Sequence, residues 1–123
     1  MIKYHAKITS IGPHVAAFKE EGILVLFGAN APEELAEFSI LHDGARLLAP
    51  LAVGDEVHID AHAFRVLAIG HIANQNLANL GHLILKFNGQ ATPELPGDVC
   101  VEAGEIPDIQ IGTVVVLQGP DSE

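Results

Sequence analysis

The stretch EVHIDAH, residues 56–62, alternates apolar and polar side chains with a period of two. Val57, Ile59 and Ala61 fall on one face of an extended chain, and acids and histidines fall on the other. The segment HLILKF (82–87) shows the same alternation. A strand with one apolar face and one polar face predicts a sheet that covers a core on one side.

Six further runs are rich in β-branched and aromatic residues, and Gly, Pro and Asn separate them. They are IKYHAKITSI (2–11), ILVLF (23–27), EFSILH (37–42), AFRVLAIG (63–70), DVCVEA (98–103) and TVVVLQ (113–118). Short strands at regular spacing are typical of a sandwich or a barrel rather than of alternating strands and helices. We therefore expect an all-β fold, a small closed barrel of short antiparallel strands with Greek-key-like connections.

Two segments interrupt the strand pattern and predict one or two short helices. The segment NAPEELAEF (30–38) has a capping Asn, a Pro and two acids where a helix begins. The segment IANQNLANLG (72–81) ends on Gly81, a typical helix stop.

The length of 123 residues and a hydrophobic content of 49% predict one domain, residues 1–119, with a disordered tail at 120–123. The run VVVL (114–117) is apolar on both faces. Such a strand favours a second layer or a partner subunit, so a homodimer is one expectation.

The net charge limits the classes of partner that we expect. Sixteen acidic residues against six basic ones give a net charge of −10, which excludes nucleic acid as an expected partner and suits a basic docking protein. The single cysteine, Cys100, forms no intrachain disulfide and favours a reducing compartment. With no signal peptide and no apolar run of membrane-spanning length, we expect a cytoplasmic protein that is not embedded in a membrane.

His42 ends the run ILH and is followed by Asp43 and Gly44. A strand end before a glycine turn predicts a side chain exposed at the rim of the barrel. A neutral imidazole is a competent nucleophile near pH 7 and leaves again easily. Asp43 is placed to orient a ring nitrogen or to raise its pKa. An ordinary polar turn residue is the alternative interpretation.

His82 follows Gly81 at the start of a strand, where it is either a hydrogen-bond donor to an anion or a histidine bonded to a backbone carbonyl. Together with His58, His62 and His71 it leaves open a metal-dependent barrel enzyme. The ligand spacings HExxH and CxxC are absent, so we expect no metal.

Three segments carry a family resemblance: APEELAEFSILH (31–42), VGDEV (53–57) and VLAIGHIANQNLANLGHLILKFNG (66–89). The third is the most specific, because its Asn, Leu and Gly-His residues stand at fixed spacing. Weaker agreement extends to ITSIG (8–12) and IPDIQIGTVVVL (106–117). On these segments the chain resembles the glucitol/sorbitol-specific enzyme IIA component of the bacterial phosphotransferase system.

The resemblance implies a small all-β barrel that acts as a phosphocarrier. Such proteins accept a phosphoryl group from the protein HPr onto one histidine. They pass it to the IIB part of a IIB/IIC transporter, which phosphorylates the incoming hexitol. The resemblance implies no cofactor and no metal.

The same resemblance assigns roles to individual residues. The phosphorylated histidine of the family stands ten residues after the Pro of an AP-x-x-L motif, which from Pro32 is His42, and the resemblance suggests Nε2 as the acceptor. The family's Gly-His pair falls on Gly81 and His82, and we expect His82 to assist. Some members carry an extra residue and a second histidine after the reactive one, whereas Asp43 and Gly44 follow directly here.

Asp43 and the backbone near Gly44 and Gly81 are expected to contact the phosphoryl group, since clustered N–H groups bind phosphate oxygens. A third hypothesis is a non-catalytic regulatory barrel that binds a partner without using the His42 imidazole.

Overall fold

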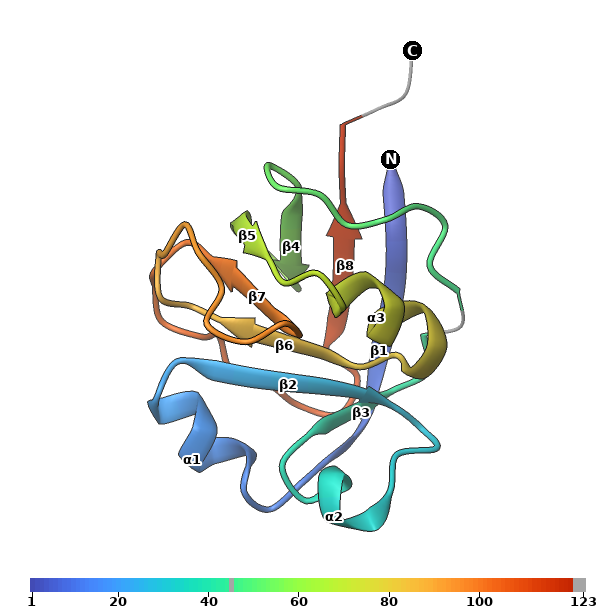
Figure 1. The fold of residues 1–123 in the computed structure, drawn as a ribbon. Helices are drawn as coiled ribbons and strands as arrows, with labels where there is room; N and C mark the ends of the chain where they lie inside the picture. The colour runs from blue at the N-terminus through green and yellow to red at the C-terminus, as the bar shows by residue number, and fades with distance from the viewer. Residues whose placement is uncertain (45, 121–123) are drawn as a thin grey trace.

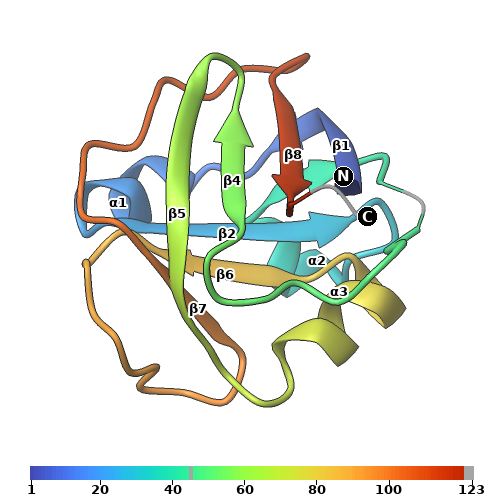
Figure 2. The same cartoon turned by 90° about the horizontal axis from the view of Figure 1, so that it is seen from above.

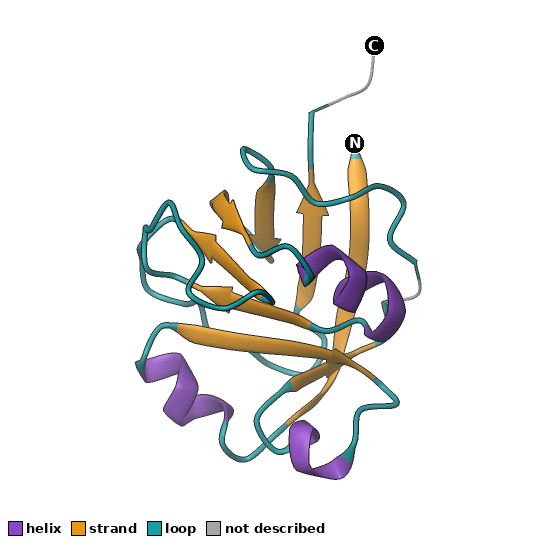
Figure 3. Cartoon of the chain, viewed as in Figure 1, coloured by secondary structure: helices purple, strands orange, loops and turns teal. Residues whose placement is uncertain are grey.

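The computed structural model describes residues 1–44 and 46–120. Over these residues, eight strands close into a barrel and three short helices lie outside it (Figures 1 and 3). The strands are β1 (Ile2–Ile11), β2 (Ile23–Gly28), β3 (Ile40–His42), β4 (Glu56–Ile59), β5 (His62–Ile69), β6 (Leu83–Lys86), β7 (Asp98–Val101) and β8 (Val114–Gln118). The helices are α1 (Val15–Glu20), α2 (Glu33–Ala36) and α3 (Ala73–Leu80). The predicted closed barrel is confirmed, and each of the eight expected runs contains a strand.

The order of strands around the barrel is β1-β3-β2-β6-β7-β5-β4-β8. Seen from above, β5 crosses over β2 and β6, and its neighbours β4 and β8 lie on the same side of the barrel (Figure 2). Of the apolar run 114–117, Val115 and Leu117 face the interior and are buried, whereas Val114 and Val116 on the other face of β8 are half-exposed. A homodimer stays a prediction.

The sequence pattern led us to expect only antiparallel strands, but two of the pairings are parallel. β2 runs parallel to β3, and β6 runs parallel to β7, while the other six pairings are antiparallel. Parallel neighbours need a long crossover rather than a tight turn. Residues 29–39, with α2, and residues 87–97 supply those crossovers.

The core follows the predicted alternation. Val57 and Ile59 are fully buried, and Glu56 and His58 on the other face of β4 are half-exposed. Leu83 and Leu85 of β6 are buried in the same way. At roughly 25 cal/mol per Å² of apolar surface, burying one such side chain stabilises the fold by about 1.5–3 kcal/mol. The hydrophobic interior therefore lies within the closed barrel.

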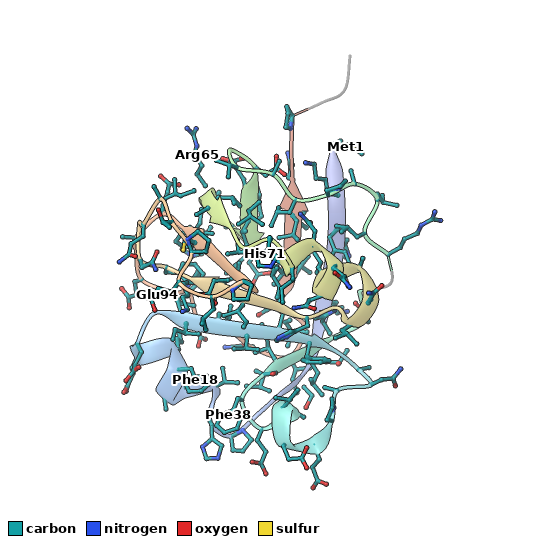
Figure 4. The ribbon with its side chains drawn as sticks, in the orientation of Figure 1. Met1, Phe18, Phe38, Arg65, His71 and Glu94 are labelled. Carbon is teal, nitrogen blue, oxygen red and sulfur yellow. The ribbon has the colours of Figure 1, made fainter. Side chains whose placement is uncertain are left out.

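Helix α1 was not expected from the sequence, which predicted one or two helices. It is a single short helix with only Val15 buried and no side-chain cap, so it carries little periodic signal. Its Phe18 stacks on Phe38, with ring centroids 5.2 Å apart, and Phe38 stacks on His14 (Figure 4). Contacts between distant segments therefore stabilise this helix more than its own sequence does.

The two ends of the described chain lie together, because the Met1 ammonium donates a hydrogen bond of 2.8 Å to the Gly119 carbonyl (Figure 1). Residues 121–123 of the tail expected at 120–123 lie outside the described residues. Among the helices that the structure describes, none is long and apolar enough to cross a membrane.

Candidate functional site

His42 is the last residue of β3 and lies opposite Gly28, the last residue of the parallel strand β2. A cavity of about 400 Å³ opens at this end of the two strands. Four segments line it: Tyr4 of β1, residues 27–30, residues 42–44 and residues 77–81. Figure 1 shows why they meet, since the end of α3 lies beside the start of β6 and the end of β2.

The His42 ring is less exposed than the sequence predicted. Only 1% of the residue is accessible to solvent, so it forms the floor of the cavity and not a free rim. The reason is tertiary, because α3 and the loop after β2 close around the strand end. A visiting group must therefore approach through the open cavity.

Two backbone groups determine the protonation of the imidazole. Nε2 lies 2.8 Å from the Gly81 carbonyl oxygen, which can only accept a hydrogen bond, so Nε2 carries the proton. Nδ1 accepts a hydrogen bond of 3.0 Å from the Gly44 N–H. The ring is thus held neutral, with its lone pair on Nδ1, and both contacts fix its orientation.

Burial lowers the pKa of His42 below its ordinary value of 6.5, because the charged imidazolium loses hydration. The Gly81 hydrogen bond and the charge of Asp43 oppose this effect without overcoming it. The ring is accordingly neutral at pH 7, the form that acts as a nucleophile.

We expect the His42 ring to titrate below pH 6.5, measured by NMR from the pH dependence of its carbon-bound ring protons. The unfolded chain binds this proton near pH 6.5 and the folded chain does not. The free energy of unfolding should therefore fall as the pH drops below 6.5, through this group, and recover above it. A His42 midpoint at or above 6.5 would contradict the buried neutral state.

The sequence placed Asp43 either to orient a ring nitrogen or to raise its pKa, but the hydrogen bonds that orient the imidazole come from Gly81 and Gly44. The Asp43 carboxylate Oδ1 accepts a hydrogen bond of 2.8 Å from the Lys7 N–H, and the Asp43 N–H donates to the Lys7 carbonyl. Asp43 therefore anchors the chain after β3 to β1. It still lines the cavity, where its charge acts on His42 through space.

Gly81 contributes its carbonyl rather than the N–H that was expected to cradle an anion. Its N–H donates to the Leu77 carbonyl and so caps α3. The residue has φ +64°, a left-handed conformation that glycine adopts without strain. A Cβ atom at this position would lie 2.9 Å from His42 Cε1 and 3.1 Å from the Gly28 nitrogen.

Gly81→Ala is expected to lower the free energy of unfolding by about 1–2 kcal/mol for the left-handed backbone and also to displace the His42 ring. Gly54→Ala is the matched control, because Gly54 has φ +96° and open space around the Cβ position. Denaturant unfolding and the His42 ring resonances measure the two effects. Both variants should lose stability, but only Gly81→Ala should shift the His42 resonances. Unchanged resonances in Gly81→Ala would contradict the close packing of these two residues.

His82 lies next to this arrangement but its ring does not line the cavity. Its Nδ1 donates a hydrogen bond of 3.2 Å to the Leu26 carbonyl, and the ring packs on Phe27 with centroids 4.6 Å apart. Since Phe27 does line the cavity, we propose that His82 assists indirectly, by holding the end of β2.

The histidines of the metal-site hypothesis are not brought together. Within residues 1–44 and 46–120, no group of three or more His, Cys, Asp or Glu side chains could hold a metal ion. His58 instead lies 3.2 Å from the carboxylate of its strand neighbour Glu56. A larger hollow of about 480 Å³ surrounds Lys3 and Asp55, but these two form an ion pair of 2.6 Å.

The sequence over residues 3–116 matches the family of phosphotransferase system (PTS) glucitol/sorbitol-specific IIA components. The chain belongs to this family. It is 35% identical over 116 residues to the PTS glucitol/sorbitol-specific EIIA components of Shigella flexneri and of Escherichia coli strain K12, covering 94% of this chain and 94% of each relative. The crystal structure of a PTS IIA component from Enterococcus faecalis V583 superimposes with a TM-score of 0.80 at 26% identity, covering 94% of this chain and 99% of that one.

This IIA chain also has a cavity residue that the sequence analysis missed. Tyr4 lies on β1, and its ring meets the His42 ring edge to face, with centroids 5.8 Å apart. Its place in the run IKYHAKITSI identifies it only as a strand residue, since alternation shows that a side chain points inward but not what it meets.

Proposed function

We propose that His42 accepts a phosphoryl group from phospho-HPr and passes it to the IIB part of a IIB/IIC transporter for glucitol/sorbitol. One observation carries this proposal: a neutral imidazole, held by two backbone hydrogen bonds, forms the floor of an open cavity. A phosphocarrier needs a nucleophile that is accessible, oriented and uncharged at neutral pH. The family supports the same role.

We propose Nδ1 of His42 as the acceptor atom, in place of the Nε2 that the resemblance suggests. The lone pair on Nδ1 attacks phosphorus in line, an N–P bond forms there and the donor's N–P bond breaks. The proton on Nε2 stays on its hydrogen bond to Gly81 throughout. Attack by Nε2 would require that proton to move to Nδ1 and the Gly81 contact to break.

The proposed transfer needs the Gly44 N–H to change partner. In the free protein this group donates to Nδ1. When the N–P bond forms, Nδ1 loses its lone pair and the N–H is released toward the phosphoryl oxygens. Gly44 is then a phosphate contact, as expected from the sequence, but only in the phosphorylated state.

The electrostatics of the cavity favour a labile phosphoryl group. Among the described residues that line it there is no Lys or Arg, and Asp43 is the one carboxylate. A phosphoryl group there meets no Lys or Arg among the described lining residues. The ring that carries it keeps its Nε2 proton and so becomes a positively charged, good leaving group, and the N–P bond stays reactive toward the next acceptor. Such a cavity suits a carrier better than a stable phosphate-binding site.

In this role the chain works in the cytoplasm and docks in turn with HPr and with the transporter. The net charge of −10 supports docking to basic partner surfaces, because complementary fields speed encounter. Neither the metal-dependent enzyme nor the non-catalytic barrel has an observation in its favour among the described residues.

The test is phosphorylation of the purified chain with phosphoenolpyruvate, enzyme I and HPr. Intact-mass spectrometry should show one added phosphate, which leaves when the IIB domain is added. Phosphorus–nitrogen correlation NMR should place it on Nδ1 of His42. No added phosphate would overturn the proposed function, and a phosphate on Nε2 would overturn the proposed acceptor atom alone.

A further inference from the structure

Among the described residues that line the His42 cavity, only Tyr4 carries a side-chain hydroxyl. The residue is 4% exposed, and its ring is perpendicular to the His42 ring. Ring-to-ring packing alone would be met equally well by phenylalanine. Ring packing therefore does not account for the hydroxyl, and a buried tyrosine usually donates its O–H to a partner.

The Tyr4 hydroxyl has no hydrogen-bond partner among residues 1–44 and 46–120, and it is not sealed from solvent, because the residue lines the open cavity. Burial and the nearby Asp43 carboxylate raise the pKa of the phenol above its ordinary value of 10.0. The group accordingly keeps its proton at neutral pH and is a donor with no acceptor in the described part of the chain.

Gly44 lies between the hydroxyl end of Tyr4 and the imidazole, because it contacts both. The Gly44 N–H donates to Nδ1, and a Cβ atom on Gly44 would lie 2.6 Å from the Tyr4 hydroxyl oxygen. The phenol thus occupies the space that a side chain at position 44 would need. The Gly44 N–H therefore contacts the one imidazole nitrogen that has a lone pair, and the Tyr4 O–H lies next to Gly44.

We propose that the Tyr4 hydroxyl binds the phosphoryl group carried on Nδ1 of His42, donating its hydrogen bond to a phosphoryl oxygen alongside the Gly44 N–H. This inference rests on the proposed function. The phenol keeps its proton, so it stabilises the phosphoryl dianion without acting as an acid. Its contribution is large because no Lys or Arg stands among the described lining residues.

The composition of the chain allows a direct test. Tyr4 is the only tyrosine and there is no tryptophan, so the tyrosine emission of the protein reports on this one hydroxyl. We expect the emission intensity to change when wild type is phosphorylated and to stay constant when His42→Asn receives the same treatment. An emission that is identical before and after phosphorylation of His42 would overturn the inference.

The Tyr4→Phe variant removes the hydroxyl and keeps the ring that packs on Gly44 and His42. A hydrogen bond to a charged group is worth roughly a ten- to hundredfold change in an equilibrium constant. We expect the equilibrium constant for transfer from phospho-HPr to Tyr4→Phe to fall about tenfold or more. An equilibrium constant within about twofold of wild type would overturn the inference.

Ser39→Ala is the matched control, because it also removes a buried hydroxyl, one that donates to the Leu35 carbonyl at 2.7 Å outside the cavity. It should lose some stability and keep the transfer equilibrium within about twofold of wild type. An equal fall in Ser39→Ala and Tyr4→Phe would show a loss of stability and not of phosphoryl binding, which also contradicts the inference.

Phosphoramidate, a small chemical donor of phosphoryl groups to histidine, separates this inference from the proposed function. If wild type accepts a phosphoryl group on His42 from phosphoramidate but not from phospho-HPr, the carrier role fails. The emission change in wild type would still support the inference, as would a phosphorylated Tyr4→Phe variant that loses its phosphate faster than wild type. If His42 accepts no phosphoryl group from either donor, both proposals fail.

Discussion

Phosphoryl uptake from phospho-HPr is expected to fall below detection in His42→Asn. The side chain of Asn keeps an oxygen near the position of Nδ1, so it can still accept the Gly44 N–H and preserve the turn after β3. It has no imidazole lone pair, and therefore no N–P bond can form. The measurement is the mass of the protein after incubation with phosphoenolpyruvate, enzyme I and HPr.

His82→Asn is the matched control for that experiment. The substitution removes an imidazole, as His42→Asn does, but the ring of His82 does not line the cavity. The His82→Asn variant should still be phosphorylated. Its rate should fall less than about tenfold, because loss of the His82 hydrogen bond disturbs only the end of β2. A phosphate retained in His42→Asn and lost in His82→Asn would move the acceptor to His82. Circular dichroism and a thermal melt should first show that both variants are folded.

Lys86→Met is expected to lower the free energy of unfolding by about 3–5 kcal/mol, because it leaves a buried carboxylate without its counter-charge. The Lys86 ammonium lies 2.7 Å from Asp98 Oδ2, and Asp98 is fully buried. This hydrogen bond is the main cause that raises the pKa of Lys86. Since a domain of this size has a free energy of unfolding of about 5–15 kcal/mol, the expected loss is a fifth or more of the total stability.

Urea unfolding followed by far-ultraviolet circular dichroism measures this loss. Lys7→Met is the control, since it makes the same change at an exposed position and should cost less than about 0.5 kcal/mol. Adding Asp98→Asn to Lys86→Met should recover part of the loss by removing the unpaired charge. A loss in Lys86→Met no larger than in Lys7→Met would show that the buried pair does not stabilise the fold.

The effect of Lys86→Met should be confined to stability. Because Lys86 does not line the His42 cavity, phosphoryl uptake per folded molecule should match wild type.

The strand positions could be predicted from the sequence because burial on one face requires alternation along each strand. The run 37–42 shows the limit of that signal, since only Ile40–His42 forms a strand. The residues before it complete the turn after α2, where the Ser39 hydroxyl donates to the Leu35 carbonyl. Local hydrophobicity does not distinguish a strand from the turn that leads into it.

The sequence indicated His42 as a candidate site residue from its position at a strand end before a glycine. It indicated Gly81 as a helix stop. The contact between them could not be predicted, because 39 residues separate them. The direction of β3 relative to β2 depends on the crossover through α2, and the parallel pairing places both strand ends at one cavity. Tyr4 reaches the same cavity from the far end of the chain.

By itself the sequence determined which runs contain strands, which side chains of the alternating strands are buried, and that His42 ends a strand before a glycine turn. These are local properties, set by side-chain periodicity and by the backbone freedom of glycine. Only the tertiary structure decided that the imidazole is buried and neutral, that its lone pair is on Nδ1, and that Tyr4 stands beside it. Those properties arise from groups that meet only when the barrel closes, because burial and hydrogen bonding depend on neighbours in space and not on neighbours in sequence.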